Sequence, residues 1–285
     1  MKQKLIITLS VIIISCILIF TFTRCPNPKT DNEDIEITSL PEKLPLNISV
    51  YLDLSDRLTR DLTPSQADRD TAIVNHLVDI FIDDCIKDKI INSSNHFQIF
   101  FYPSPNNSQI AQLARGLNLD MSKCNIKNKK KELMEMKQRF QNNLSQIYSD
   151  ALEQQKWVGS DIWGFFSNKE VDKLCIRKGY RNILVILTDG YLYHTNNKVQ
   201  DGNAYSYILP QTLAIDNSSL IVKRNNLSNL EVLMLEVNPY SPAQHDKLMS
   251  VLEDWFRNMG VEKFVVSETA LPVNTEVYID SFIND

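Results

Sequence analysis

The sequence predicts an α/β fold with a doubly wound, mostly parallel sheet that carries helices on both faces. Short apolar segments rich in β-branched residues alternate with longer segments whose apolar residues recur at helical spacing. The short segment 181–190 contains a continuous apolar run, as expected of a strand buried on both faces, and 230–237 is predicted to be another buried strand. The 285 residues, 43% of them hydrophobic and 23% charged, are sufficient for one such domain.

The expected elements follow in order from residue 47. The first strand is apolar and β-rich, and Thr63, Pro64 and Gln66 then form a capping box with proline in the first turn of a helix. Residues 104–128 indicate no more than a short edge strand, and 191–229 are polar and irregular. The predicted strands are 47–55, 96–103, 181–190, 230–237 and 262–268, and the predicted helices are 63–86, 129–155, 160–175, 241–260 and 274–284.

The first 25 residues have the pattern of a membrane anchor or signal segment. Lys2 and Lys4 precede an uncharged apolar run of 19 residues, 5–23, close to the length that spans a bilayer. Cleaved signals have shorter apolar regions, so a single-pass anchor is favoured over a cleaved signal or a lipoprotein. The positive N-terminal flank favours a body outside the cytoplasm, either periplasmic or at the cell surface.

The rest of the chain divides into a linker and one domain. Residues 26–45 are polar, acidic and punctuated by proline, which is typical of a linker, and the domain covers 46–285. A net charge of −5 argues against general nucleic-acid binding, which requires a basic surface. The body cysteines, Cys85, Cys124 and Cys175, allow at most one disulfide among themselves and lack the spacing of a zinc site.

Polar side chains follow the first strand, the long helix and the strand at 181–190. They are Asp53 and Ser55, then Ser160 and Asp161, then Asp189. Ligands of an open parallel sheet bind beyond the carboxyl ends of the strands, near the point where strand order reverses. We therefore expect these residues to meet at one edge of the sheet. Ligands with oxygen donors alone suit a hard divalent cation such as Mg²⁺, Mn²⁺ or Ca²⁺, with waters completing its shell.

The same motifs, in the same order, resemble the von Willebrand factor A domain. "DLSDR" resembles the first motif of that family, Asp-x-Ser-x-Ser, and "GSDIWGFF" resembles its second loop, with Ser160 at the usual threonine. "ILVILTDG" resembles its third motif, and the resemblance covers roughly residues 45–285. It implies that Asp53, Ser55, Ser160 and Asp189 hold a metal ion, and that the ion takes an acidic side chain from a protein partner.

Arg57 departs from the family pattern, because it stands where the family has a second serine. If the site is related to that of the family, the Arg57 side chain has two possible arrangements. Its guanidinium replaces the ion by pairing with Asp53 or Asp189, or it turns outward and water fills the vacant coordination position. Asp161 and His194 are further candidates for binding a ligand or neutralising the site. For His194, an ordinary surface position is the alternative.

The resemblance implies a membrane-tethered, extracytoplasmic protein-binding module without catalytic residues. Its membrane contact would be limited to the N-terminal segment. One alternative is a metal-free structural component of a cell-envelope assembly. Another is a metal-assisted hydrolase that uses Asp53, Asp189 and a bound water. That reaction is less favoured, because no nucleophile–base pair stands out in the sequence.

Overall fold

A computed structural model describes residues 43–104, 106–154, 160–191, 200–201, 204–205, 224–239 and 242–284. Leu44–Asp285 forms a unit of its own. The predicted anchor at 1–25 and most of the predicted linker at 26–45 lie outside the described residues. Within the described ranges, no helix combines the length and the apolar character needed to cross a bilayer.

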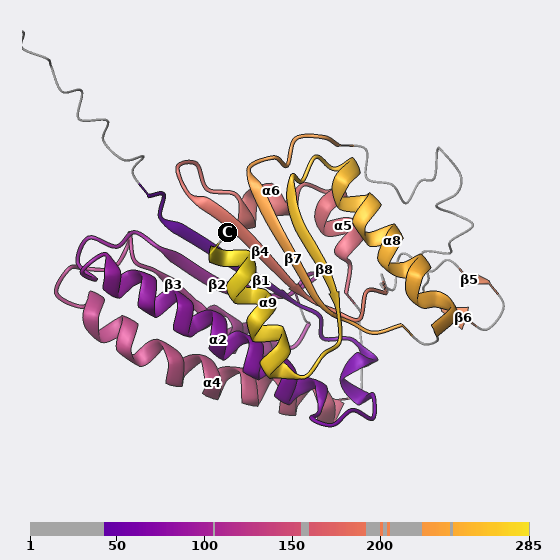
Figure 1. Cartoon of the computed structure of the whole chain (residues 1–285). Helices are drawn as coiled ribbons and strands as arrows, with labels where there is room; N and C mark the ends of the chain where they lie inside the picture. The colour runs from indigo at the N-terminus through magenta and orange to yellow at the C-terminus, as the bar shows by residue number, and fades with distance from the viewer. Residues whose placement is uncertain are drawn as a thin grey trace, which may run out of the picture. The chain divides into compact units, whose positions relative to one another are not determined.

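The centre of this unit is a six-stranded sheet with the order β3-β2-β1-β4-β7-β8 (Figure 1). Neighbouring strands are parallel except β3, which runs antiparallel to β2. Strand order reverses between β1 and β4, so their carboxyl ends flank the switch point of a doubly wound sheet. The strands are β1 (Leu46–Leu52), β2 (His96–Phe100), β3 (Asn118–Asp120), β4 (Arg181–Leu187), β7 (Leu230–Val237) and β8 (Lys263–Glu268). A separate pair joins β5 (Gln200–Asp201) and β6 (Ala204–Tyr205).

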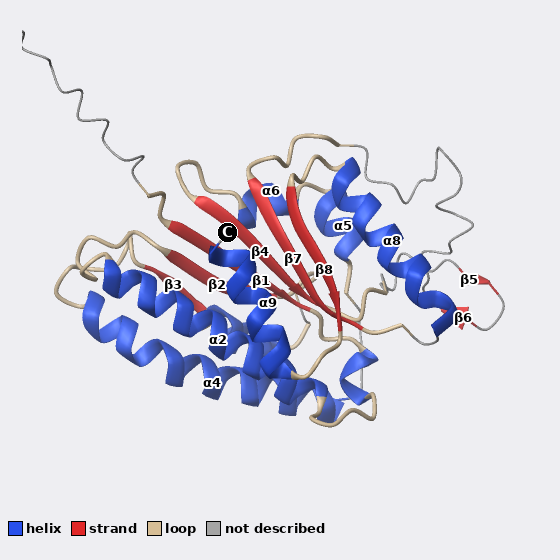
Figure 2. Ribbon diagram, in the orientation of Figure 1, coloured by secondary structure: helices blue, strands red, loops and turns tan. Residues whose placement is uncertain are grey.

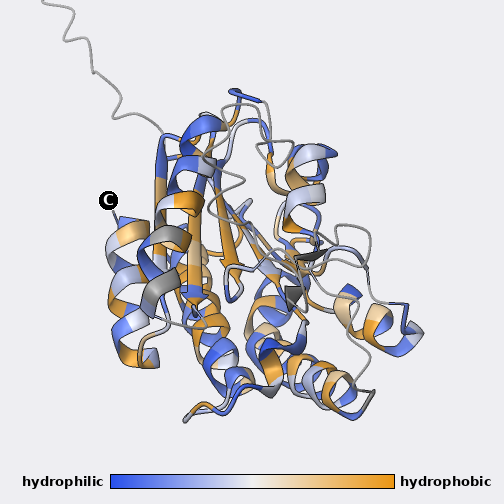
Figure 3. Ribbon diagram, turned by 90° about the vertical axis from the view of Figure 1, so that its right-hand side faces the viewer, coloured by the Kyte–Doolittle hydropathy of each residue, from blue (hydrophilic) through white to orange (hydrophobic). Residues whose placement is uncertain are grey.

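Helices cover both faces of the sheet, which confirms the predicted fold class (Figure 2). Alternate side chains of β4 divide between two apolar clusters, Val185 facing one and Ile186 the other. Figure 3 shows the hydrophobic residues concentrated on the strands and on the inward sides of the helices. One face carries α2 (Gln66–Lys87), α3 (Ser108–Arg115), α4 (Lys129–Gln154) and α9 (Pro272–Asn284), and the other carries α5 (Ile162–Ser167), α6 (Glu170–Cys175) and α8 (Pro242–Asn258).

Some boundaries differ from the sequence prediction for local reasons. The predicted helix at 160–175 is two helices, α5 and α6, because Lys169 adopts a left-handed conformation with φ 60° between them. Helix α2 is capped by Ser65, whose hydroxyl accepts the N–H of Asp68, instead of by Thr63. Helix α3 was not predicted, although Asn107 caps it. The short edge strand appears as β3.

The three body cysteines are free thiols. Cys85 and Cys175 are buried, and burial raises the pKa of the Cys85 thiol to about 11. The thiolate is the reactive form, so Cys85 is a packing residue instead of a nucleophile at neutral pH.

His96, at the start of β2, is buried with an uncharged ring. Its Nδ1 lies 2.7 Å from Oδ1 of Asn47, whose amide nitrogen donates to two other oxygens, so Nδ1 must be the donor. That leaves Nε2 to accept from the amide of Asn118 at 3.2 Å. Burial, followed by the nearby charge of Arg177, lowers the pKa of His96 to about 4. Protonation of Nε2 would therefore place an N–H donor of His96 against the amide N–H of Asn118.

We expect stability to fall as the pH is lowered from about 6.5 to 4. In this window His96 takes up a proton in the unfolded chain, with its ordinary pKa of 6.5, but remains neutral in the folded chain. Each unit by which the pKa of His96 differs between the folded and unfolded chain is worth about 1.4 kcal/mol. The free energy of unfolding should therefore fall by about 3 kcal/mol across this pH range. Urea unfolding of the wild type and His96→Gln across this range measures it. The variant should lose less stability than the wild type, and equal losses would contradict the prediction.

Candidate functional site

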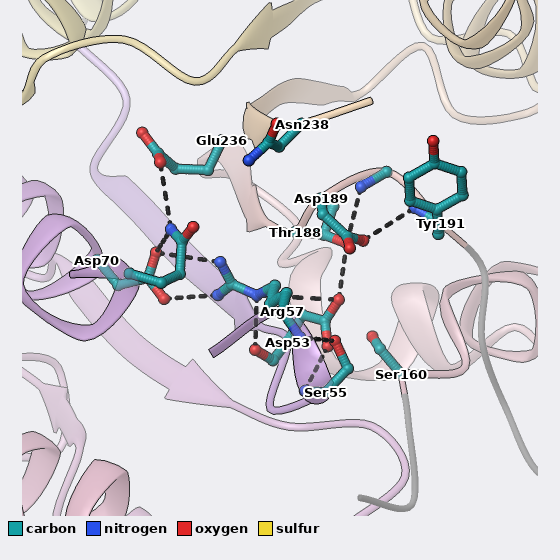
Figure 4. A network of polar contacts seen from close by, with 12 residues as sticks. Asp53, Ser55, Arg57, Asp70, Ser160, Thr188, Asp189, Tyr191, Glu236 and Asn238 are labelled. Atoms are coloured by element: carbon teal, nitrogen blue, oxygen red, sulfur yellow. Dashed lines mark hydrogen bonds and ion pairs between the residues drawn. The ribbon is translucent and has the colours of Figure 1, made fainter. Parts of the chain in front are cut away.

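The candidate site lies at the carboxyl ends of β1 and β4, and we call this edge of the sheet the rim (Figure 4). Asp53 follows β1 directly, and its N–H donates to the carbonyl of Leu187 at 3.0 Å, extending the pairing of the two strands. Asp189 follows β4, and its carbonyl accepts the N–H of Asn238 at 3.0 Å. The sheet itself therefore places both carboxylates at the switch point.

Asp53 is 1% exposed, and its carboxylate is held by two donors. Oδ1 accepts the N–H of Ser55 at 2.9 Å, and Oδ2 accepts the hydroxyl of Thr188 at 2.8 Å. Burial raises the pKa of Asp53 above its ordinary value, although the charge of Arg57 and these hydrogen bonds act in the opposite direction. Thr188, which sequence analysis did not single out, thus orients the first predicted ligand.

Asp189 is also buried and has two partners. Oδ1 accepts the N–H of Tyr191 at 3.1 Å, and Oδ2 lies 2.8 Å from Nη2 of Arg60. Burial and then the negative charge of Asp53 raise the pKa of Asp189 to about 7, while Arg60 lowers it. The turn needs glycine at Gly190, which has φ 89° and where an added Cβ would lie 3.0 Å from a Val237 methyl group.

Ser160 and Asp161 precede α5 and have different roles. The hydroxyl of Tyr51 donates to the carbonyl of Tyr102 at 2.6 Å, so the Ser160 hydroxyl, 2.7 Å away, must donate to Tyr51. The oxygen of Ser160 therefore keeps its lone pairs for another ligand. Asp161 instead caps α5, because its Oδ1 accepts the N–H of Gly164 at 2.8 Å.

Arg57 is fully buried and turns away from Asp189. Its guanidinium lies against the carboxylate of Asp70 on α2, with Nη2–Oδ2 and Nη1–Oδ1 distances of 2.5 and 3.3 Å. Its Nε donates to the backbone carbonyl of Asp53 at 2.9 Å and lies 4.0 Å from that residue's Oδ2. Arg57 does not turn outward. It keeps a long ion pair with Asp53, one of the two expected partners, but its closest partner is Asp70, an acid outside the predicted site.

A buried polar network continues from Asp70 under the rim. Asp70 also accepts the hydroxyl of Tyr148 at 2.8 Å and the amide of Gln66 at 3.0 Å. The same amide reaches Glu236 at 3.1 Å, and Nε of Arg69 donates to Glu236 at 2.9 Å. This network joins α2, α4 and β7, and through Asp70 it holds the guanidinium of Arg57 in place.

Arg60 is a charged residue of the rim that sequence analysis missed. Besides Asp189 it donates through Nη1 to the carbonyl of Asn238 at 2.5 Å, and its guanidinium carbon lies 5.9 Å from the ring centre of Tyr191. It directly follows the short 3-10 helix η1 (Asp56–Thr59). The arginine that neutralises Asp189 is therefore Arg60, whereas Arg57 was the one considered from the sequence.

The rim brings together the four predicted metal ligands, Asp53, Ser55, Ser160 and Asp189 (Figure 4). All four are buried, and the hydroxyl of Ser55 accepts the N–H of Arg57 at a long distance of 3.4 Å. His194, proposed as a neighbour, lies outside the described residues.

The donor set and the local charge fit a hard divalent cation. In the described part of the chain, no group of three or more His, Cys, Asp or Glu side chains is arranged to hold a metal, so hydroxyls would provide half of the protein ligands. Oxygen donors of this kind suit Mg²⁺ or Mn²⁺. Asp70 balances the charge of Arg57, so the charge that remains to balance Asp53 and Asp189 is that of Arg60. The rim therefore keeps one net negative charge when both carboxylates are ionised.

Comparison with known proteins gave no matching family, no matching curated protein and no matching solved structure. The resemblance to the von Willebrand factor A domain consequently stays a prediction from motifs.

Proposed function

We propose that this chain is a von Willebrand factor A-like protein-binding module, held outside the cytoplasm by its N-terminal segment. The observation that carries the proposal is the convergence of two buried carboxylates and two hydroxyls at the switch point of the sheet. Asp53, Ser55, Ser160 and Asp189 would hold a divalent cation there. The bound cation would supply an electron-poor coordination position for an acidic side chain of the partner.

The residues around the ligands support this role by preparing the donor atoms. Thr188 and the N–H of Ser55 hold the Asp53 carboxylate in one orientation, so little ordering is left for an arriving ion. The Tyr51 hydroxyl likewise orients the Ser160 hydroxyl, and the lone pairs of the Ser160 oxygen can still coordinate a cation. Preorganised ligands raise cation affinity because the entropy of ordering them is lost during folding instead of during binding.

Binding is favoured over hydrolysis because no described histidine lies at the rim and both rim carboxylates already accept hydrogen bonds from neighbouring donors. The described histidines have partners elsewhere. His76 pairs with Asp280, His96 with Asn47, and His245 with Glu268. General-base chemistry requires a proton acceptor within hydrogen-bond reach of the reacting atom, and histidine is the commonest one.

Calorimetric titration of the detergent-solubilised full-length chain with Mn²⁺ or Mg²⁺ tests the proposal. We expect saturable binding that Asp53→Asn weakens by about 10- to 100-fold, because the variant keeps the shape of the side chain but removes its charge. Asp172→Asn is the control, since Asp172 pairs with Arg224 away from the rim. No binding at millimolar concentrations would contradict the proposal and favour a metal-free structural component.

A further inference from the structure

The two arginines near the rim differ in how firmly they are held. The side chain of Arg57 is 0% exposed and has a buried carboxylate, Asp70, as its own partner. The side chain of Arg60 is 16% exposed, and it follows a turn whose residues Asp56 and Thr59 are exposed. Both arginines pair with a buried carboxylate, but the side chain of Arg60 is the more exposed of the two. Arg60 can therefore move toward solvent when a cation takes its place at Asp189, whereas Asp70 lies outside the predicted ligands and would be left unpaired if Arg57 moved.

Arg60 also holds one of the two carboxylate oxygens of Asp189. The other carboxylate oxygen, Oδ1, accepts the N–H of Tyr191, and Oδ2 faces the guanidinium at 2.8 Å. A cation held by both Asp53 and Asp189 would meet a like charge at that position. Mutual repulsion makes simultaneous occupation unfavourable in a buried site.

We propose that Arg60 is a built-in competitor of the divalent cation, which the ion must displace from Asp189 before both carboxylates can hold it. This inference rests on the proposed function and adds the residue that sets the affinity of the site. Arg60 lowers that affinity, so weakly binding cations leave the guanidinium in place. The displaced guanidinium stays tethered beside the rim, where it can pair with the acidic group of a partner. Cation and partner therefore strengthen each other's binding.

Calorimetric titration of the full-length chain with Mn²⁺ compares the wild type, Arg60→Gln and Arg257→Gln. We expect Arg60→Gln to bind Mn²⁺ at least about tenfold more tightly, because a unit positive charge is removed from the site. The glutamine amide can still donate to Asp189, which protects the fold. Arg257 is 61% exposed on α8 and pairs with Asp254, so Arg257→Gln makes the same charge change and should bind like the wild type.

A second measurement follows the arginines directly in the wild-type chain. The side-chain Nε–H resonances of Arg60 and Arg57 are recorded by NMR while Mg²⁺ is added, and we expect Arg60 to shift and Arg57 to stay. Equal Mn²⁺ affinity for wild type and Arg60→Gln, or an unmoved Arg60 resonance at saturation, overturns the competitor role and leaves the proposed function standing. Absence of cation binding in every variant overturns both.

Discussion

Replacing Arg57 by methionine should lower the free energy of unfolding by about 3–5 kcal/mol, the usual loss when one partner of a buried ion pair is removed. Asp70 is 0% exposed, and the variant leaves it with Tyr148 and Gln66 as its hydrogen-bond donors and without a paired cation. The backbone carbonyl of Asp53 also loses the Nε donor. Chemical denaturation followed by circular dichroism measures the difference.

Two comparisons separate this mechanism from a general effect of losing an arginine. The double variant Arg57→Met/Asp70→Leu should recover part of the loss, because it removes the uncompensated charge as well. Arg60→Met also removes the partner of a buried carboxylate, but the pKa of Asp189 is already raised to about 7, so that side chain can take up a proton and the loss of stability should be smaller. The interpretation fails if Arg57→Met is no more destabilising than Arg60→Met. It also fails if Arg57→Ser, with the residue usual in the von Willebrand family, has wild-type stability.

The fold could be predicted because its signals are local. The strand at 181–190 is apolar on both faces, and such a segment has few alternatives to the centre of a parallel sheet. The positions of Asp53 and Asp189 followed from the same pattern, since they are the first acids after two such strands. Parallel pairing of β1 with β4 then brings them to one edge.

The partners of the two arginines could not be predicted, because they depend on tertiary packing. Arg60 reaches Asp189, 129 positions away in the sequence, and nothing near Arg60 indicates it. For Arg57 a signal was present. Asp70 lies on the same side of α2 as Ile73 and Leu77, at helical spacing, and all three are buried. An acid within an apolar stripe requires a cation nearby, and Arg57 is in the segment just before that helix.

Phe165→Ala should destabilise the chain by about 3–5 kcal/mol, as expected for removing a fully buried aromatic side chain. Phe165 lies on α5 at the centre of a group of rings, 5.3 Å from the ring centre of Tyr51, 5.4 Å from Phe100 and 5.3 Å from Phe166. Truncation opens a cavity among rings that cannot collapse without moving α5. Thermal and urea unfolding measure the change.

Trp163→Ala is the matched control, because Trp163 is on the same helix but only half-buried. It should lower the stability by less than half as much as Phe165→Ala, and equal losses would contradict the packing argument.

Loss of the Phe165 ring should also weaken cation binding at the rim, since this ring packs against Tyr51 and the Tyr51 hydroxyl orients Ser160. The milder variant Phe165→Leu should therefore keep the fold and weaken Mn²⁺ binding, whereas Trp163→Ala should leave binding unchanged. This outcome would show that the aromatic cluster under α5 both stabilises the sheet and positions a ligand of the site.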